Sequence, residues 1–433
     1  MAILALILAT ISLFLCYLRL KIENYIAVLF IVVTFSGIAS RIVMYFFGDA
    51  SGIFNAIPFI SVIPIWVRFL IKLPYLLNKS FSPLIALCLI SFTTYFFLGA
   101  VENFIASIYS FFTFSTFFIF LLMPYLYKIR QDKLYEALMP VFKVTLAVVI
   151  GYGLSQFVLG PNAIDVYWMA AVKFNSLGLP LPFAIKPFSV LSSPGSYSVF
   201  LLIAFVLVVN NYYIVRKKRS SLLGVYLVIA LIMVAQITTG VRSSLLIMFC
   251  MTGYFLAKQL VERRIFFKAF LSTILILVVA LQLLPLTQVE DLQQLQSRVT
   301  EIDRSDISYN KRIDQLRYAL NEIAENPIGF GLGSSGRFSN NSLHIENGYT
   351  ELIYQMGVFL GSIILLIIVS LFFTKNKMGN RIEYESYFIL PIYGKLILLI
   401  LLLIMLFTHI LQQPIGWLGI FFYAISNLNL NKS

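Results

Sequence analysis

The feature that most constrains this chain is a series of apolar stretches that recurs from one end to the other. Each is long enough to form a helix of about 20 residues, which is the length needed to cross the hydrocarbon core of a membrane. Apolar residues occupy 60% of the 433 positions and charged residues 12%, a composition that excludes a water-soluble enzyme. A porin-type barrel would show shorter segments of alternating polarity. The sequence therefore predicts an all-α polytopic membrane protein.

The apolar stretches predict 12–13 transmembrane helices, and the number depends on the last stretch. That stretch is shorter than the others and is interrupted near Gln412, Gln413 and Pro414. The predicted spans fall at about 1–18, 25–47, 57–77, 81–101, 104–127, 134–159, 195–215, 221–239, 242–260, 265–285, 347–373, 387–408 and 411–427.

Basic residues in alternate short loops predict the orientation of the chain. With the N-terminus outside, the loops expected on the cytoplasmic side are all basic, whereas the external loops at 48–56 and 101–103 contain acids without Lys or Arg. Much of the net charge of +13 is thereby a topological signal, and we expect no nucleic-acid partner. The basic loops are Arg19 to Lys21, Lys128 to Lys133, Arg216 to Arg219, Lys258 to Lys268 and Lys375 to Arg381.

Two external loops are longer than a simple connection requires. The first covers about 160–194, and the second, 286–346, contains nine of the chain's 19 acidic residues. Apolar residues at helical spacing predict an amphipathic helix from about Asn310 to Glu325, which ends before Asn326-Pro327 because a residue preceding proline disfavours the helical conformation. We therefore divide the chain into 1–285, with about ten transmembrane helices and the 160–194 loop; 286–346, a long extracytoplasmic subdomain; and 347–433, the C-terminal transmembrane helices.

Positive charges on the external side are informative because the topology rule does not place them there. Arg242 stands at the external end of a predicted helix, where arginine is costly unless it faces a cavity or an anion. It is interpreted either as an interface anchor or as a guanidinium that grips phosphate through its planar fork. The other external basic residues are Lys173, Lys186, Arg298, Arg304, Lys311, Arg312, Arg317 and Arg337.

Arg312 lies in the first turn of the predicted amphipathic helix, where a positive charge opposes the helix macrodipole. Helix stability therefore does not explain its position, and anion binding is one interpretation. Arg317 lies further along the same helix, and pairing with Asp314 or Asn321 is a sufficient structural explanation for it.

The segment Gly329 to Gly336 contains a G-x-G-x-x-G pattern. A nucleotide-binding fingerprint is excluded by its surroundings, because a helix and a proline precede it and no βαβ unit encloses it. We expect a flexible turn whose backbone amides, including those of Gly331 and Gly333, approach a ligand; a plain turn is the alternative.

The chain has only two histidines, and the three cysteines lie far apart inside apolar stretches. Neither a disulfide framework nor a metal site is indicated, and we expect no cofactor. His409 is interpreted as an interfacial residue, whereas His344 lies two residues before Glu346 at the mouth of a predicted helix. We then expect a group of polar residues at one membrane surface: Arg242, Arg312, His344, Glu346 and Asn347. A general base beside phosphate-binding arginines suits attack of a hydroxyl on a carbon bearing a diphosphate. The alternative is a polar loop docked through ion pairs.

Several of these motifs resemble the bacterial O-antigen ligase and O-antigen polymerase (Wzy-like) superfamily of membrane glycosyltransferases. The resemblance covers about residues 190–361 by motif and the rest by hydropathy. The matching elements, in chain order, are Gly240-Val241-Arg242-Ser243-Ser244-Leu245-Leu246, Arg312, Glu325 to Gly333, Glu346-Asn347-Gly348-Tyr349 and Gly357 to Gly361.

The resemblance implies a polytopic, GT-C-like enzyme of the bacterial inner membrane, with its active site on the periplasmic side and no metal or nucleotide sugar. Arg242 and Arg312 would hold the diphosphate of an undecaprenyl-diphosphate-linked glycan, and membrane lipid and a chain-length regulator protein are the further partners. Glu346 or His344 would be the catalytic base, while Arg317, Asn347, Tyr349, Gly331 and Gly333 would contribute to substrate binding.

One position departs from the ligase pattern. In that pattern a histidine directly precedes an Asn, Ser or Gln, and nine residues lie between this residue and a glycine. Here Asn347 and Gly357 fit that spacing, but Glu346 occupies the histidine position. We therefore expect a repeat-unit polymerase, with an O-antigen ligase acting on lipid A-core or protein as the first alternative. A transporter or flippase of lipid-linked oligosaccharide is the alternative from another class, although transporters tend to show paired repeats and polar residues near the midplane.

Overall fold

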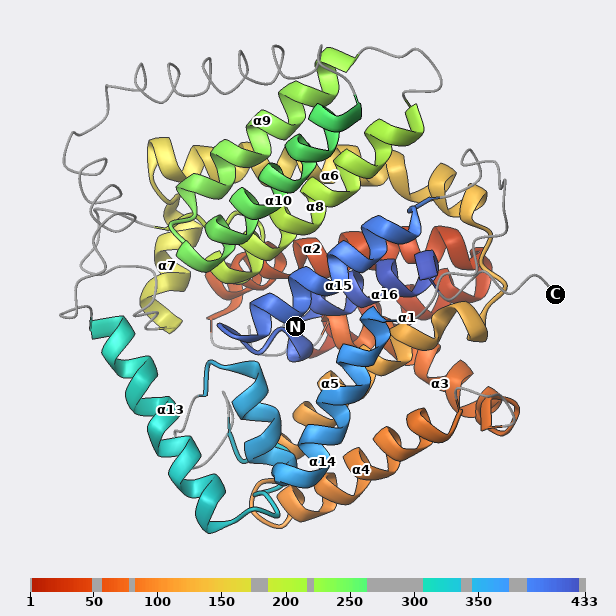
Figure 1. The fold of residues 1–433 in the computed structure, drawn as a ribbon, viewed down its shortest axis with the longest axis vertical. Helices are drawn as coiled ribbons and strands as arrows, with labels where there is room; N and C mark the ends of the chain where they lie inside the picture. Colours follow the sequence, from red (N-terminus) through yellow and green to blue (C-terminus); the bar gives the residue numbers. More distant parts are fainter. Residues whose placement is uncertain are drawn as a thin grey trace. The chain divides into compact units, whose positions relative to one another are not determined.

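The fold is seen in a computed structural model that describes residues 2–48, 57–77, 82–172, 186–215, 222–262, 307–335, 345–373 and 388–427. Every regular element in these ranges is helical (Figure 1). Among them, six helices are long and apolar enough to cross a membrane: α2 (Ile22–Phe47), α3 (Ile57–Leu77, over Ile57–Tyr75), α5 (Phe104–Leu126), α6 (Gln131–Leu159), α8 (Pro194–Val215, over Pro194–Tyr212) and α14 (Gly348–Phe372). The prediction of an all-α polytopic membrane protein is confirmed.

Shorter apolar helices account for other predicted spans. They are α1 (Ala2–Arg19), α4 (Ser82–Ala100), α9 (Leu222–Thr238) and α15 (Pro391–Met405), while α10 (Arg242–Glu262) corresponds to the stretch predicted at 242–260. The stretch at 265–285 lies outside the described residues, and the count of 12–13 spans stays a prediction.

The interruption expected in the last apolar stretch is a break in the helix. A single 3₁₀ turn, η5 (Ile410–Gln412), precedes α16 (Pro414–Asn427). Proline is suited to the first position of a helix, because the backbone N–H that it lacks would have no partner there. The 14 residues of α16 are fewer than the roughly 20 that cross the hydrocarbon. Residues 415–427 are all buried, so α16 is a core element of its unit.

The chain forms two compact units. Unit 1 comprises Met1–Ser12, Ile26–Ile57 and Glu136–Ile302, and unit 2 comprises Leu13–Tyr25, Pro58–Tyr135 and Asp303–Ser433. In unit 1, α8 packs against α9 and α10 (Figure 1), and its residues 196–210 are buried without interruption. Burial on all sides explains why α8 is apolar around its whole circumference, as expected for a helix inside a bundle.

A short helix in the first external loop, α7 (Ala163–Val172), was not predicted. It begins after Asn162, whose side-chain Oδ1 accepts the backbone N–H of Asp165 at 2.9 Å, a contact that satisfies one of the unpaired donors at a helix start. The helix brings Asp165 into the interior of unit 1, where the residue is fully buried.

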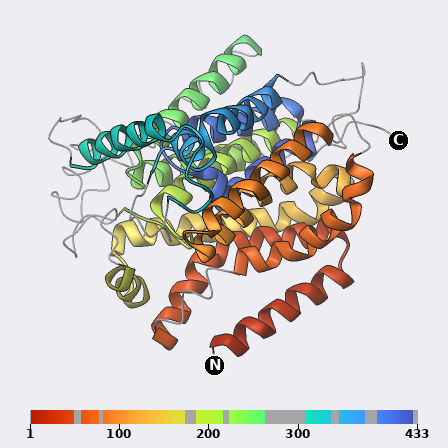
Figure 2. The same ribbon diagram turned by 90° about the horizontal axis from the view of Figure 1, so that it is seen from below.

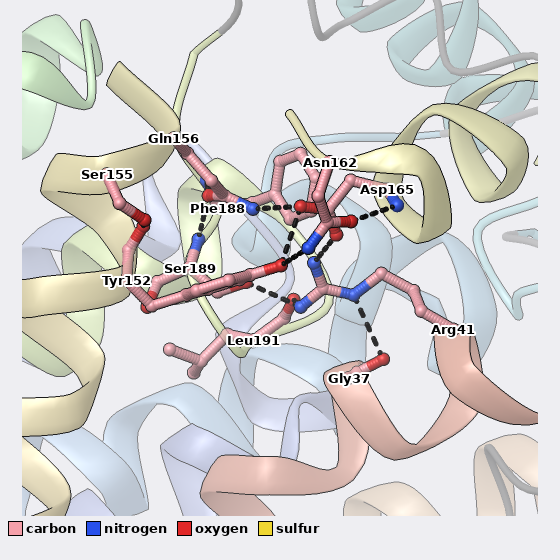
Figure 3. Close-up of polar contacts among 10 residues, drawn as sticks. All are labelled: Gly37, Arg41, Tyr152, Ser155, Gln156, Asn162, Asp165, Phe188, Ser189 and Leu191. Carbon is pink, nitrogen blue, oxygen red and sulfur yellow. Dashed lines mark hydrogen bonds and ion pairs between the residues drawn. The ribbon is translucent and has the colours of Figure 1, made fainter. Parts of the chain in front are cut away.

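Asp165 pairs with Arg41 of α2, which is also fully buried (Figure 3). The Arg41 Nη1 donates to Asp165 Oδ1 at 2.5 Å, and the other carboxylate oxygen accepts hydrogen bonds from Tyr152 and Gln156, both at 2.8 Å. The ring of Phe188 lies 4.6 Å from the guanidinium carbon and adds a cation–π contact. A buried ion pair is tolerated only when its remaining donors and acceptors are satisfied, and this network meets that condition.

Unit 2 contains the second group of helices. Here α5 packs against α4 and α16, and α15 packs against α16. Trp417 of α16 is fully buried, and its indole N–H donates to the backbone oxygen of Thr113 in α5 at 3.2 Å. The amphipathic helix predicted from about Asn310 to Glu325 is confirmed as α13 (Ile307–Glu325), which packs on α14 (Figure 2).

Replacement of Arg41 by methionine is expected to destabilise the protein by about 3–5 kcal/mol, because it leaves the Asp165 carboxylate buried without its cation. The measurement is the free energy of unfolding of the purified protein in detergent micelles. Arg130→Met is the matched control, since Arg130 forms an ion pair with Asp132 at the same distance but is 67% exposed, and such pairs contribute about 0–1 kcal/mol. Equal losses in the two variants would contradict this assignment.

Candidate active site

Arg242 is the first residue of α10, directly after the turn formed by Thr239, Gly240 and Val241. The turn is possible because Gly240 adopts a left-handed conformation, with φ of +62°, that ends α9 and redirects the chain. Arg242 is exposed, and its positive charge lies at the helix end where the macrodipole favours anions. Helix stability therefore does not account for an arginine at this position.

The first turn of α10 is fixed against α8. The hydroxyl groups of Ser244 and Ser198 are hydrogen-bonded at 2.9 Å, and both residues are buried. Leu246, the second member of the R-x-x-x-L element, is 64% exposed. Arg242 and Leu246 are four residues apart and therefore share one face of α10.

Arg312 and Arg317 are both on α13. The helix begins at Ile307, three residues earlier than predicted, so Arg312 is its sixth residue and lies in the second turn; the prediction that it lies in the first turn is wrong. Arg317 is exposed, whereas Ala319 and Ile323 on the opposite side are buried against α14 and the segments next to it. The side chain of Arg312 lies outside what the structure describes, so its role and that of Arg317 in binding an anion stay predictions.

The exposed face of α13 also carries Tyr318 and Glu322, one helical turn apart. A hydrogen bond with the Glu322 carboxylate raises the pKa of the Tyr318 phenol, because that bond needs the phenolic proton. Arg317, which directly precedes Tyr318, is exposed as well, whereas Glu322 is half-buried.

The glycine-rich turn is packed tightly against three helices of unit 2. Gly329, Gly331 and Gly333 all have positive φ values, between +85° and +95°. A Cβ atom at Gly329 would lie 2.3 Å from the backbone N of Gly357 in α14, and one at Gly331 equally close to that of Gly99 in α4. Close approach of backbone to backbone thus explains why glycine stands at these positions.

The amides of this turn donate to protein acceptors. Gly331 N–H donates to the Gln355 backbone oxygen at 2.9 Å, and Gly333 N–H to the Gln355 side-chain Oε1 at 3.1 Å. Between them, Leu332 N–H donates to the backbone oxygen of Tyr95 at 2.9 Å. These bonds agree with the plain turn that the sequence analysis left open, and substrate binding by Gly331 and Gly333 stays a prediction.

The Glu346-Asn347-Gly348-Tyr349 element lies at the start of α14. Asn347 is the N-cap, and its Oδ1 accepts the N–H groups of Tyr349 and Thr350, both at 3.0 Å. Its Nδ2 donates to the backbone oxygen of Leu406 at 2.9 Å, and the Tyr349 hydroxyl donates to that of Leu402 at 2.6 Å. Asn347 and Tyr349 therefore fix the start of α14 against α15, and Glu346, directly before the cap, is half-buried.

Sequence reasoning missed a buried carboxyl group one turn into α14. Glu351 is 2% exposed, and its Oε1 accepts hydrogen bonds from Gln412 at 3.0 Å and from Gln355 at 3.3 Å. Gln355 also donates to the hydroxyl of Ser335 at 2.9 Å, which connects the carboxyl to the glycine-rich turn. The available signal was an acid inside an apolar span, because such residues usually have a functional or a network role.

The residues predicted to form one active site are divided between the units. Arg242 belongs to unit 1, whereas Arg312, Arg317 and the residues of the glycine-rich turn and of the α14 start belong to unit 2. His344 lies outside the described residues. The meeting of the arginines with Glu346 in one cavity stays a prediction.

Comparison with known proteins supports the resemblance inferred from the motifs. Residues 225–365 match the family model described as O-antigen ligase. This range contains Arg242, Arg312, the glycine-rich turn and the start of α14 as far as Gly361. No curated protein and no solved structure matches the chain. The resemblance to the O-antigen ligase and polymerase superfamily is confirmed over these residues, and it supports a function of that general type.

Replacement of Gly331 by alanine is expected to destabilise the protein by about 2–5 kcal/mol, because the new Cβ would require both a left-handed alanine and a shift of α4. Gly151→Ala is the matched control. Gly151 is an exposed residue of α6 with open space around its α-carbon, and alanine there is expected to stabilise the helix by about 0.5–1 kcal/mol. The free energy of unfolding of the two variants checks the sign of each change, and a Gly331→Ala protein as stable as the natural one would contradict the packing argument.

Proposed function

We propose that this protein is a membrane glycosyltransferase that polymerises the repeat units of a surface polysaccharide, such as an O-antigen or an exopolysaccharide. The donor is a nascent glycan on undecaprenyl diphosphate, and the acceptor is a sugar hydroxyl on an incoming lipid-linked repeat unit. The observation that carries the proposal is the match of residues 225–365 to the O-antigen ligase family, with Arg242 exposed at the start of a helix that it does not stabilise.

The proposed reaction is a displacement at the anomeric carbon of the donor. The acceptor hydroxyl forms the new C–O bond while the bond from that carbon to the diphosphate oxygen breaks, and the diphosphate leaves with the bonding electron pair. Arg242 and Arg312 bind the diphosphate and stabilise the charge that develops on it, through charge-assisted hydrogen bonds to phosphate oxygens. No metal ion takes part in this scheme.

Glu346 is the proposed base that accepts the proton of the attacking hydroxyl, and His344 is the second candidate for that role. Two features support Glu346. It stands at the position that the family pattern gives to histidine, and it directly precedes Asn347, whose side chain is fixed by three hydrogen bonds to Tyr349, Thr350 and Leu406. A base must be held within hydrogen-bonding reach of its proton, and a capped helix start provides a rigid attachment for it.

The replacement of histidine by Glu346 is also the reason for proposing a polymerase. A polymerase and a ligase share the lipid-linked donor and the same displacement chemistry, and they differ in the acceptor. The proposed location is the bacterial inner membrane, with the reaction on its periplasmic side, because Arg242 is at the end of α10 that the distribution of basic loops places outside.

Arg242→Ala and Glu346→Gln, made singly, are each expected to lower the rate of elongation by about 100-fold or more, the usual effect of removing an electrostatic stabiliser or a general base. The assay uses purified full-length protein in liposomes with undecaprenyl-diphosphate-linked repeat units, and measures the length of the glycan over time. Arg130→Ala is the control, because Arg130 is exposed on a loop predicted to be cytoplasmic. Elongation by both site variants at the natural rate would contradict the proposal.

The same liposomes separate the alternatives. Addition of lipid A-core or of an acceptor protein, followed by identification of the group at the reducing end of the product, distinguishes a ligase from a polymerase. Passage of a labelled lipid-linked glycan across the bilayer without a change in its length would indicate a transporter.

A further inference from the structure

Lys186 is a basic residue that has no role in the proposed reaction as described above. It lies in the segment 186–193 that leads into α8, and it is one of the basic residues that the topology rule does not explain. The segment is not helical before Pro194, so its backbone depends on other parts of unit 1 for hydrogen bonds.

The buried side chains of Arg41 and Gln156 hold the central part of this segment in place (Figure 3). Arg41 Nη2 donates to the backbone oxygens of Ser189, at 2.5 Å, and of Leu191, at 3.2 Å. Gln156 Oε1 accepts the N–H groups of Phe188, at 3.1 Å, and of Ser189, at 2.7 Å. The Arg41–Asp165 network thus fixes the chain two residues after Lys186.

The conformation of Ser189 shows how strongly the segment is held. Ser189 is the one non-glycine residue with a positive φ, of 52°, among the described parts of the chain. Such a conformation is unfavourable for a residue with a side chain and persists only where the surroundings impose it. Its hydroxyl donates to the backbone oxygen of Val149 in α6 at 2.6 Å, which adds a further restraint.

This segment places the side chain of Lys186 next to the turn that precedes Arg242. A Cβ atom at Gly240 would lie 3.7 Å from both Cγ and Cε of Lys186 and 3.9 Å from its Cδ. The aliphatic part of the lysine therefore runs along the α-carbon of Gly240, two residues before Arg242. Because Ser244 is hydrogen-bonded to Ser198, the start of α10 is itself fixed to the helix that follows the Lys186 segment.

We propose that Lys186 is a second cation of the Arg242 site and binds the diphosphate group of the lipid-linked substrate. The inference rests on the proposed function, and it adds a residue that lies outside the 225–365 family match. Arginine provides a planar fork for phosphate oxygens, whereas lysine provides a compact charge on a flexible stem. Lys186 and Arg242 would bind the diphosphate together at the Gly240 turn.

The chemistry of the leaving group gives Lys186 a specific task. In the donor, each phosphate of the diphosphate has one ester bond and one anhydride bond, and bears one negative charge. When the bond to the sugar breaks, the terminal phosphate loses its ester bond and keeps only the anhydride bond, and its charge rises toward −2, by analogy with a phosphorylated side chain near neutral pH. A cation beside Arg242 that neutralises this added charge stabilises the transition state more than the ground state, which is the condition for raising the rate.

Lys186→Met is expected to weaken binding of undecaprenyl diphosphate by about tenfold or more, the effect of removing one hydrogen bond to a charged group. Binding is measured with the full-length protein in detergent micelles, with undecaprenyl monophosphate as a second probe. The loss should be greater for the diphosphate than for the monophosphate, and Lys186→Arg should restore most of it. Lys128→Met is the matched control, because Lys128 is exposed on a loop predicted to lie on the cytoplasmic side.

The Arg242→Ala protein separates this inference from the proposed function. If Arg242→Ala weakens diphosphate binding and Lys186→Met binds like the natural protein, Lys186 is not part of the site and the proposed function stands. If neither substitution changes binding, both proposals fail. Equal losses for the two probes in Lys186→Met would also overturn the inference, because they would reflect a general change in lipid binding.

Discussion

The constraint on which this structure depends is that backbone polar groups in apolar surroundings must find partners within the protein. Helices meet this condition by themselves. Three described segments that are not helical meet it through side chains. The buried Gln355 binds the glycine-rich turn, the buried Arg41 and Gln156 bind the segment before α8, and the half-buried Asn347 binds the end of α15. Each of these segments is next to a residue proposed to take part in the reaction or in substrate binding.

The side chains that stabilise these irregular segments also bear on the proposed chemistry. An active site at a membrane surface needs irregular backbone, because helices alone would present only their ends. The irregular backbone must also be rigid, since a base or a phosphate-binding cation is effective only when it is held in place. The buried Arg41–Asp165 pair and the Glu351 network use polar groups inside the units to provide that rigidity.

Much of the fold could be predicted from the sequence, because the length of the apolar stretches reports directly on membrane-crossing helices. The amphipathic helix α13 and its end before Asn326-Pro327 were predictable from local patterns alone. The partners of the buried polar residues were not. Arg41 and Asp165 are 124 positions apart, and Glu351 and Gln412 are 61 apart, so no local pattern connects them.

The candidate site likewise has features that the sequence could predict and features that it could not. Motif order predicted which residues to consider, and the structure gives Asn347 and the glycine-rich turn defined hydrogen bonds that spacing could not supply. The glycines were interpreted as open toward a ligand because glycine permits close approach of any group. In the structure that close approach is to the backbone of Gly99 and Gly357, a contact that depends on helix packing and has no signature in the sequence.

The proposed reaction requires that phosphate-binding arginines and a proton acceptor from separate parts of the chain face one cavity. The most direct test is an experimental structure of the full-length protein with undecaprenyl diphosphate bound. We expect the guanidinium groups of Arg242 and Arg312 to contact the phosphates and the Glu346 carboxyl group to line the same cavity. A complex in which Arg242 and Glu346 line separate cavities, or face opposite membrane surfaces, would contradict it.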